Sequence, residues 1–154
     1  MTRQSKLFVN HMSRVVFDTV IFVRALLDPH SFSGRLIFKY FKHYRLFLSP
    51  SLVEEILEVL GRQEIISRFH LREVDYPKAL ARLLKAMARA EIIEIDEITA
   101  VSRDPKDDKF LATAKAANAD YLITEDEDLL VLKVYAGVKI INTATFLDII
   151  KTKP

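Results

Sequence analysis

Acidic side chains follow two apolar, strand-like runs of the chain at the point where each run ends. Asp18 comes directly after residues 15–17, and the four consecutive acids of residues 125–128 come directly after residues 121–124. An aspartate at a strand end is also a common helix cap, and an acidic loop can simply be solvated. Four consecutive acids repel one another, however, and a bound cation would remove that repulsion. Hard divalent cations choose oxygen ligands, so these residue types suit Mg²⁺ or Mn²⁺.

Two further carboxylates fall on the apolar side of expected helices. Asp107 lies three, four and seven positions before apolar residues, which places it on the buried stripe of its helix. An acid in that position needs a partner, a proton or a metal ion. Glu55 falls at the rim of the apolar arc of a helix over residues 51–60, a place that a half-exposed residue also takes. We interpret Glu55 as a site residue because the other acid groups are expected to point toward one crevice at the strand ends.

Alternating strands and helices must position these acids. The predicted strands are short runs rich in β-branched and aromatic residues, namely residues 15–17, 46–48, 92–95, 121–124 and 138–141. The predicted helices cover residues 20–27, 34–44, 51–60, 76–89, 106–117 and 143–151. This order predicts a three-layer α/β/α fold with a mainly parallel sheet of about five strands. Ligands of such sheets bind outside the carboxyl ends of the strands, where the strand-end acids are expected.

Length and composition indicate one ordinary domain. The chain has 154 residues, of which 50% are hydrophobic, and it contains no cysteine, which excludes disulfides and thiolate metal sites. We expect residues 13–154 to form this domain and residues 1–12 to be an N-terminal extension, with Met12 a candidate physiological start. The sequence shows neither a signal peptide nor an apolar run of the roughly 18–20 residues that a membrane helix needs. We therefore expect a soluble cytoplasmic protein with no membrane partner.

The net charge of +2 hides a division of charge along the chain. Residues 1–90 carry a balance of +7, residues 91–128 one of −8, and residues 129–154 one of +3. Such asymmetry suggests either an acidic site beside a basic surface or solvated helix faces with unevenly placed charges. In the basic part, Arg35, Lys39 and Lys42 alternate with aromatic residues, which suits phosphates and unpaired bases. The helical spacing of those aromatic residues is more typical of a core.

Four segments of the chain together resemble the motifs of PIN-domain nucleases. They are Val15-Val16-Phe17-Asp18-Thr19, then Ser49 with Glu55 and Leu60, then residues 104–114, and then residues 119–130. They occur in order over about residues 13–150, and four motifs in register are more specific than any one alone. The resemblance is closest to the prokaryotic PIN proteins that are toxins of type II toxin–antitoxin pairs, the virulence-associated protein C-like ribonucleases.

This resemblance implies a metal-dependent endoribonuclease that hydrolyses RNA with Mg²⁺ or Mn²⁺, held in check by a cognate antitoxin and assembled as a homodimer. The catalytic and metal-binding core that it implies consists of Asp18, Glu55, Asp107 and Asp126. The resemblance implies two additional metal ligands, Asp108 and Asp128. It also implies two hydroxyl groups beside the ligands, those of Thr19 and Thr124. Candidate contacts to substrate phosphates are Arg24, Arg35, Lys39 and Lys42.

Two positions depart from the family pattern, and one of them, Val20, favours an alternative function. Val20 stands two positions after Asp18, where the family usually has asparagine, and Arg24 stands where relatives often carry a small polar residue. The alternative hypothesis is a catalytically impaired PIN fold that binds RNA or protein. A phosphoacceptor receiver domain also places acids at strand ends. That class needs paired acids after its first strand, where this chain has Asp18 alone.

Overall fold

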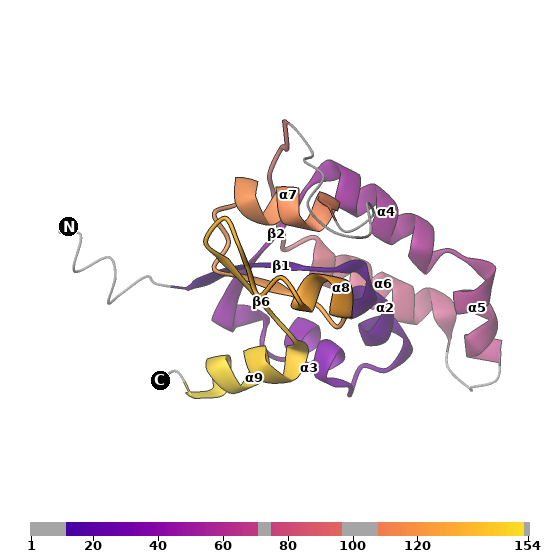
Figure 1. Ribbon diagram of the computed structural model, residues 1–154. Helices are drawn as coiled ribbons and strands as arrows, with labels where there is room; N and C mark the ends of the chain where they lie inside the picture. The colour runs from indigo at the N-terminus through magenta and orange to yellow at the C-terminus, as the bar shows by residue number, and fades with distance from the viewer. Residues whose placement is uncertain (1–11, 71–74, 97–107, 153–154) are drawn as a thin grey trace.

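A computed structural model describes residues 12–70, 75–96 and 108–152. Within them a six-stranded sheet carries helices on both faces (Figure 1). The strands are β1 (Ser13–Phe17), β2 (Tyr44–Leu48), β3 (Glu91–Ile92), β4 (Tyr121–Ile123), β5 (Val134–Tyr135) and β6 (Val138–Ile141). The helices are α2 (Thr19–Leu27), α3 (Phe32–Phe38), α4 (Pro50–Leu60), α5 (Gln63–His70), α6 (Tyr76–Met87), α7 (Asp108–Ala116), α8 (Glu127–Leu130) and α9 (Thr143–Thr152), with a 3₁₀ turn, η1 (Phe41–His43).

The strand order is β3-β2-β1-β4-β6-β5, and every pair of neighbours is parallel except the β5–β6 hairpin. Val15 of β1 pairs in register with Leu46 of β2 and with Tyr121 of β4, so β1 lies inside the sheet. The predicted α/β fold with a mainly parallel sheet is confirmed. The sixth strand, β5, has two residues, too few for an alternating pattern to show in the sequence.

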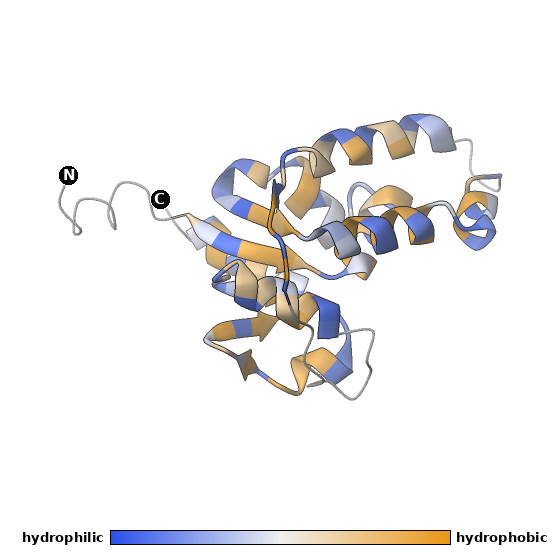
Figure 2. Cartoon of the chain, turned by 90° about the horizontal axis from the view of Figure 1, so that it is seen from above, coloured by the Kyte–Doolittle hydropathy of each residue, from blue (hydrophilic) through white to orange (hydrophobic). Residues whose placement is uncertain are grey.

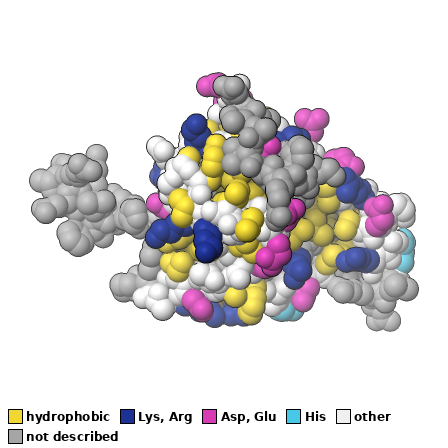
Figure 3. All heavy atoms as spheres, in the orientation of Figure 1, with side chains coloured by type: hydrophobic (Ala, Val, Ile, Leu, Met, Phe, Trp, Pro, Cys, Tyr) yellow, Lys and Arg dark blue, Asp and Glu magenta, His cyan; other side chains and the backbone are white. Residues whose placement is uncertain are grey.

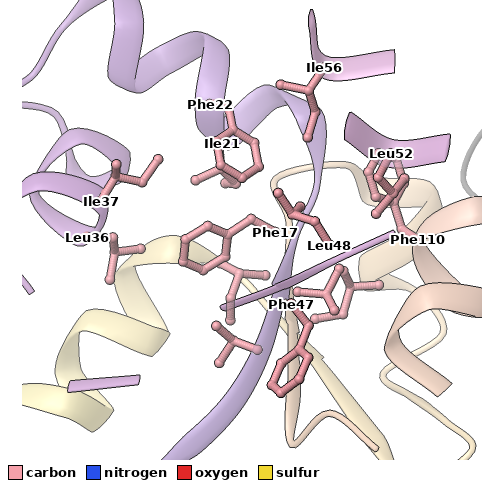
Figure 4. Close-up of a cluster of buried hydrophobic side chains, with 14 of the residues drawn as sticks. Phe17, Ile21, Phe22, Leu36, Ile37, Phe47, Leu48, Leu52, Ile56 and Phe110 are labelled. Atoms are coloured by element: carbon pink, nitrogen blue, oxygen red, sulfur yellow. The ribbon is translucent and has the colours of Figure 1, made fainter. Parts of the chain in front are cut away.

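Helices α2, α3 and α9 cover one face of the sheet, and α4 and α7 cover the other (Figure 1). On the first face, the ring of Phe17 contacts the rings of Phe22 and Tyr44 at centroid distances of 6.0 and 5.4 Å. Figure 4 shows the side chains of Leu52 and Phe110, from α4 and α7, on the second face. Hydrophobic residues therefore run along the central strands (Figure 2), as the predicted three-layer fold requires.

Helix α4 begins at Pro50, one residue before its predicted start, and Ser49 supplies its cap. Ser49 Oγ accepts a hydrogen bond from Leu52 N at 3.4 Å, and Pro50 occupies the first turn. Ser49 Oγ also lies 2.8 Å from Thr113 Oγ1 of α7, whose own proton goes to Lys109 O. The Ser49 hydroxyl therefore donates to Thr113 and ties the start of α4 to α7.

The helix predicted over residues 34–44 is divided in the structure. Helix α3 ends at Phe38, and the turn η1 follows after Lys39 and Tyr40. The break lets Tyr44 enter β2 while its hydroxyl donates to Leu36 O at 2.7 Å, back in α3. The spacing of the aromatic residues predicts one continuous helix because the hydrogen bond between Tyr44 and Leu36 depends on tertiary structure and leaves no trace in that spacing. The spacing also does not predict α5.

Candidate active site

A groove of about 700 Å³ opens at the carboxyl edge of the sheet, between α2, α4, the start of α7 and the residues after β4. Three of the four core carboxylates predicted from the sequence line it: Asp18, Glu55 and Asp126. The fourth, Asp107, lies outside the described residues. Figure 3 shows acidic side chains beside exposed hydrophobic ones on the face of the molecule that is turned to the viewer in Figure 1.

Asp18 is fixed at the end of β1 by three hydrogen bonds. Its backbone N–H donates to Ile123 O of β4 at 3.1 Å. Oδ1 accepts from Val20 N at 2.6 Å and so caps α2, while Oδ2 accepts from the hydroxyl of Thr124. The expected alternative for a strand-end aspartate, a helix cap, is thus present. Asp18 thus caps α2 and lines the groove at the same time.

Burial makes the ionised form of Asp18 costly. The residue is 6% exposed, and desolvation raises the pKa of its carboxyl group from 3.8 to about 6. Hydrogen bonds from Thr124 and Val20 act in the opposite direction, and the negative charges of Asp126 and Glu125 add to the increase. A cation bound in the groove would reverse this balance, because it stabilises the carboxylate over the carboxylic acid.

Thr124 connects Asp18 with Asp126. This threonine is fully buried at the end of β4; its hydroxyl donates to Asp18 and its oxygen accepts from Asp126 N at 2.9 Å. Asp126 Oδ1 accepts from Asp128 N at 2.8 Å and caps α8. The strand end, the threonine and the helix cap together hold the backbones of the two aspartates in a fixed arrangement.

Glu55 reaches the groove from α4 and is half-buried. Its Oε2 accepts a hydrogen bond at 2.7 Å from the hydroxyl of Thr19, the residue that directly follows Asp18. The rim position predicted for Glu55 is therefore the one found. On the same helix Glu54 is exposed, and Glu58 forms a salt bridge with Arg62 at 2.8 Å.

Glu125 acts as a helix cap across a sequence separation of 18 residues. Its Oε1 accepts from Thr143 N at 3.0 Å and from the Thr143 hydroxyl, at the start of α9. Two members of the acidic run, Glu125 and Asp126, thus cap helices, and this relieves part of the repulsion that the sequence suggests. Sequence reasoning missed the Glu125 contact because it depends on β6 bringing Thr143 alongside.

The two additional acids predicted as metal ligands are close in sequence to residues that line the groove but do not line it themselves. Asp108 is 4% exposed in the first turn of α7, and Asp128 is half-buried in α8. Both have interactions of their own within the structure.

Cationic and apolar side chains share the groove with the acids. Arg24, Arg62 and Lys109 line it, and so do four apolar residues, which are Val20, Val23, Val59 and Phe110. Sequence reasoning missed Lys109 as a groove residue, although its position two residues after Asp107 could have indicated that it lies at the site. The predicted phosphate contacts of α3 and its C-terminal side are not brought to this groove; they are Arg35, Lys39 and Lys42.

The groove's donor set consists of carboxylate and hydroxyl oxygens, the ligands that hard divalent cations prefer. Among residues 12–70, 75–96 and 108–152, no three histidine, cysteine or acidic side chains are arranged to hold a metal ion. Asp18, Glu55 and Asp126 supply only part of the predicted set, because Asp107 falls outside these ranges. Within the same ranges no helix is long and apolar enough to cross a membrane.

The parallel sheet, the acidic groove at its carboxyl edge and the glutamate on α4 define a PIN-like protein. Residues 14–128 match the family model described as PIN domain, and the chain belongs to that family. PIN domains have a nuclease fold and generally use divalent metal ions.

A solved structure is similar over the whole chain. The crystal structure of PAE2754 from Pyrobaculum aerophilum has a TM-score of 0.60 and 17% sequence identity, and the match covers 99% of this chain and 100% of that one. At this identity the similarity shows the fold alone. Comparison with curated protein sequences gives no match.

Proposed function

We propose that this protein is a metal-dependent endoribonuclease that hydrolyses RNA phosphodiester bonds in the groove at the carboxyl edge of the sheet. The observation that supports this most is the meeting of Asp18, Glu55 and Asp126 in one groove, from three separate segments. The raised pKa of Asp18 adds a physical reason for a cation to bind there. Membership of the PIN domain family supports the nuclease class.

In this proposal the groove carboxylates, together with Asp107, hold Mg²⁺ or Mn²⁺. The bound ion would neutralise charge on the scissile phosphate and lower the pKa of a water molecule. Thr124 and Thr19 orient the carboxylates of Asp18 and Glu55 through their hydroxyl protons. Asp108 and Asp128 are proposed as outer acids that complete the negative charge of the site.

Arg24 and Lys109 are proposed to bind the phosphates on either side of the scissile bond. Both line the groove, and the described residues give neither of them an acidic partner, whereas Arg62 is paired with Glu58. The apolar side chains of Val59 and Phe110 line the same groove and offer a surface for an unpaired base. This combination fits single-stranded RNA better than a double helix, whose bases are stacked inward.

Replacing Glu55 by glutamine tests the proposal. Glu55→Gln keeps the acceptor for the Thr19 hydroxyl but removes one negative charge from the proposed metal site. We expect cleavage of a mixed panel of single-stranded and hairpin RNAs, in Mn²⁺ or Mg²⁺, to fall at least about a hundredfold. EDTA should abolish cleavage by the native chain.

Glu54→Gln is the matched control for this experiment. It makes the same chemical change one residue away, on the exposed side of α4, and should leave the cleavage rate within about twofold. Equal loss in both variants, or cleavage that persists in EDTA, would contradict the proposed site. Purifying all variants identically excludes a contaminating ribonuclease.

A specific observation keeps the impaired binding module as the second candidate. Val20 is 42% exposed and lines the groove directly beside Asp18, where the resembling family carries an amide. Val20→Asn restores a hydrogen-bonding group at that position. We expect the variant to cleave RNA several-fold faster than the native chain in Mn²⁺. If the native chain binds Mn²⁺ and RNA without cleaving, while Val20→Asn cleaves, the impaired module is the correct description.

The biological setting is proposed from the motif resemblance: a cytoplasmic toxin, assembled as a homodimer and inhibited by a cognate antitoxin protein. Growth arrest on expression of the native chain, absent with Glu55→Gln, would support the toxin role. Sedimentation of the purified chain as a monomer would contradict the homodimer. Relief of growth arrest by the product of a neighbouring small reading frame would identify the antitoxin.

A further inference from the structure

Four cations lie along one side of α6 and its C-terminal end. They are Lys78, Arg82, Lys85 and Arg89, and their spacing of four, three and four residues places them on a single helical stripe, called here the α6 cation stripe. All four are exposed, while the opposite side of α6 buries Leu83, Ala86 and Met87. No acid occurs between Tyr76 and Ala90.

Aromatic rings of α3 and η1 support two members of the stripe. The guanidinium carbon of Arg82 lies 4.1 Å from the ring centroid of Phe38, and that of Arg89 lies 3.8 Å from the centroid of Phe41. Lys42 Nζ also lies 6.0 Å from the Phe41 centroid. A guanidinium held over a ring can still donate its N–H groups to phosphate oxygens and loses less freedom on binding.

The same surface extends into a second acid-free segment. Between Asp28 and Glu54 the chain has no acid and four cations. Two of them, Lys39 and Lys42, follow α3 and are exposed, and Lys39 Nζ lies 5.4 Å from the Tyr40 centroid. The ring contacts above join this segment to the α6 cation stripe.

The stripe charges repel one another without compensation from the part of the chain that the structure describes. The salt bridges among the described residues are Arg45–Glu91 and Arg62–Glu58, and neither includes a residue of the stripe. Like charges three and four residues apart destabilise a helix. A polyanion lying along α6 would turn this repulsion into attraction.

The stripe is separate from the acidic groove. No residue of α6 is among those that line the groove, and α6 packs against α2 and runs toward β3 at the edge of the sheet. We propose that the α6 cation stripe, with Lys39 and Lys42, is a second RNA-binding surface that holds backbone phosphates outside the groove. This inference rests on the proposed function in taking RNA as the substrate.

An RNA backbone fits the stripe better than an acidic protein segment. Helix residues three and four apart have Cβ atoms about 5–6 Å apart, so the four cations stand in one row that suits a regular line of phosphates. Stacked arginines suit phosphate oxygens, which they bind through paired N–H groups. The groove is lined by five acids and three cations, so without a bound metal ion its net charge opposes RNA. A cationic surface elsewhere on the chain would therefore supply much of the affinity.

RNA binding in EDTA tests the surface without requiring cleavage. The stripe variant carries four neutralising changes, Lys78→Gln, Arg82→Gln, Lys85→Gln and Arg89→Gln. The matched control removes the same four charges at three exposed lysines elsewhere, through Lys115→Gln, Lys139→Gln and Lys133→Glu. Fluorescence anisotropy with a labelled single-stranded RNA of about 30 nucleotides gives Kd over a range of salt concentrations.

We expect the stripe variant to bind roughly tenfold or more weakly at about 0.1 M salt, and its slope of log Kd against log salt to fall by about 3. The control has the same net charge and should keep the native slope. Because Arg82 and Arg89 also pack on rings, Lys78→Gln with Lys85→Gln serves as a second variant. Its slope should fall by about 1.4, since it loses two contacts.

The outcomes separate this inference from the proposed nuclease activity. If the stripe variant binds RNA like the control, the second surface is wrong, even where the native chain cleaves RNA; an acidic protein partner would then be the alternative for the stripe. If binding depends on the stripe but no metal supports cleavage, the RNA surface stands and the proposed activity fails. If the native chain binds no RNA, the inference is also overturned.

Discussion

Asp18→Asn is expected to abolish RNA cleavage and, at neutral pH without metal, to stabilise the fold. The substitution removes a negative charge from the proposed metal site, which should reduce the rate at least about a hundredfold. It also removes a charge that is buried among other acids. The amide oxygen can still accept from Val20 N, so the cap of α2 is kept.

The gain in stability follows from the raised pKa of Asp18. Its carboxyl pKa is about 6 in the folded chain and near 3.9 in an unfolded one. Stability from the protonated carboxyl is fully present below about pH 4 and is lost as the pH rises through 6, because the unfolded chain releases the proton first. Two pKa units correspond to about 3 kcal/mol. In the variant the Thr124 hydroxyl loses its charged acceptor, and this loss reduces the gain in the free energy of unfolding by about 1 kcal/mol.

Urea unfolding from pH 4 to pH 8 in EDTA measures this difference. We expect Asp18→Asn to equal or fall below the native chain at pH 4 and to exceed it by about 2 kcal/mol at pH 7 and above. Asp148→Asn, an exposed acid on α9, is the control and should show no such trend. A difference between Asp18→Asn and the native chain that does not vary with pH would refute the buried, raised-pKa carboxyl.

Divalent metal should reverse the order of stability. At a Mn²⁺ concentration about 100 times Kd, a site present only in the folded state adds about 2.7 kcal/mol. We expect this gain in the native chain and its loss in Asp18→Asn. Equal stabilisation of both proteins by Mn²⁺ would show that the ion binds elsewhere.

Gly34→Ala is expected to be the most destabilising single-methyl change in the chain. A Cβ at Gly34 would lie 2.2 Å from Pro29 O and 2.7 Å from Asp28 O, both backbone atoms of the turn between α2 and α3. Backbone cannot move aside as a side chain can, so the turn and α3 must shift together. We expect a loss of about 3 kcal/mol in the free energy of unfolding, or about 6–12 °C in Tm.

Gly61→Ala provides the matched control. Its nearest neighbour would be Leu57 O at 3.5 Å, an ordinary contact, and its φ of −90° suits any residue. We expect a change within about 0.5 kcal/mol, or a slight gain from the lower entropy of the unfolded chain. If both variants melted alike, the close approach of α3 to the preceding turn would not exist as described.

Much of the candidate site could be predicted because its placement follows local rules. Asp18 and Asp126 each follow a buried parallel strand, and such strand ends meet at one edge of a sheet. The half-buried state of Glu55 follows from helical periodicity alone. The contacts that orient these side chains are different: Thr124 and Asp18 are 106 residues apart, and Ser49 and Thr113 are 64 apart.

The sequence by itself determined the order of elements, the mainly parallel sheet and the acids that reach its carboxyl edge, because strand and helix periods are local properties of the chain. The tertiary structure decided the rest. It assigned Glu125 to capping α9 and divided the expected helix after Phe38. It also separated Lys39 and Lys42 from the groove and placed Lys42 beside the α6 cation stripe. Hydrogen bonds and ring contacts between distant segments depend on strand order and helix packing, and sequence spacing does not encode these.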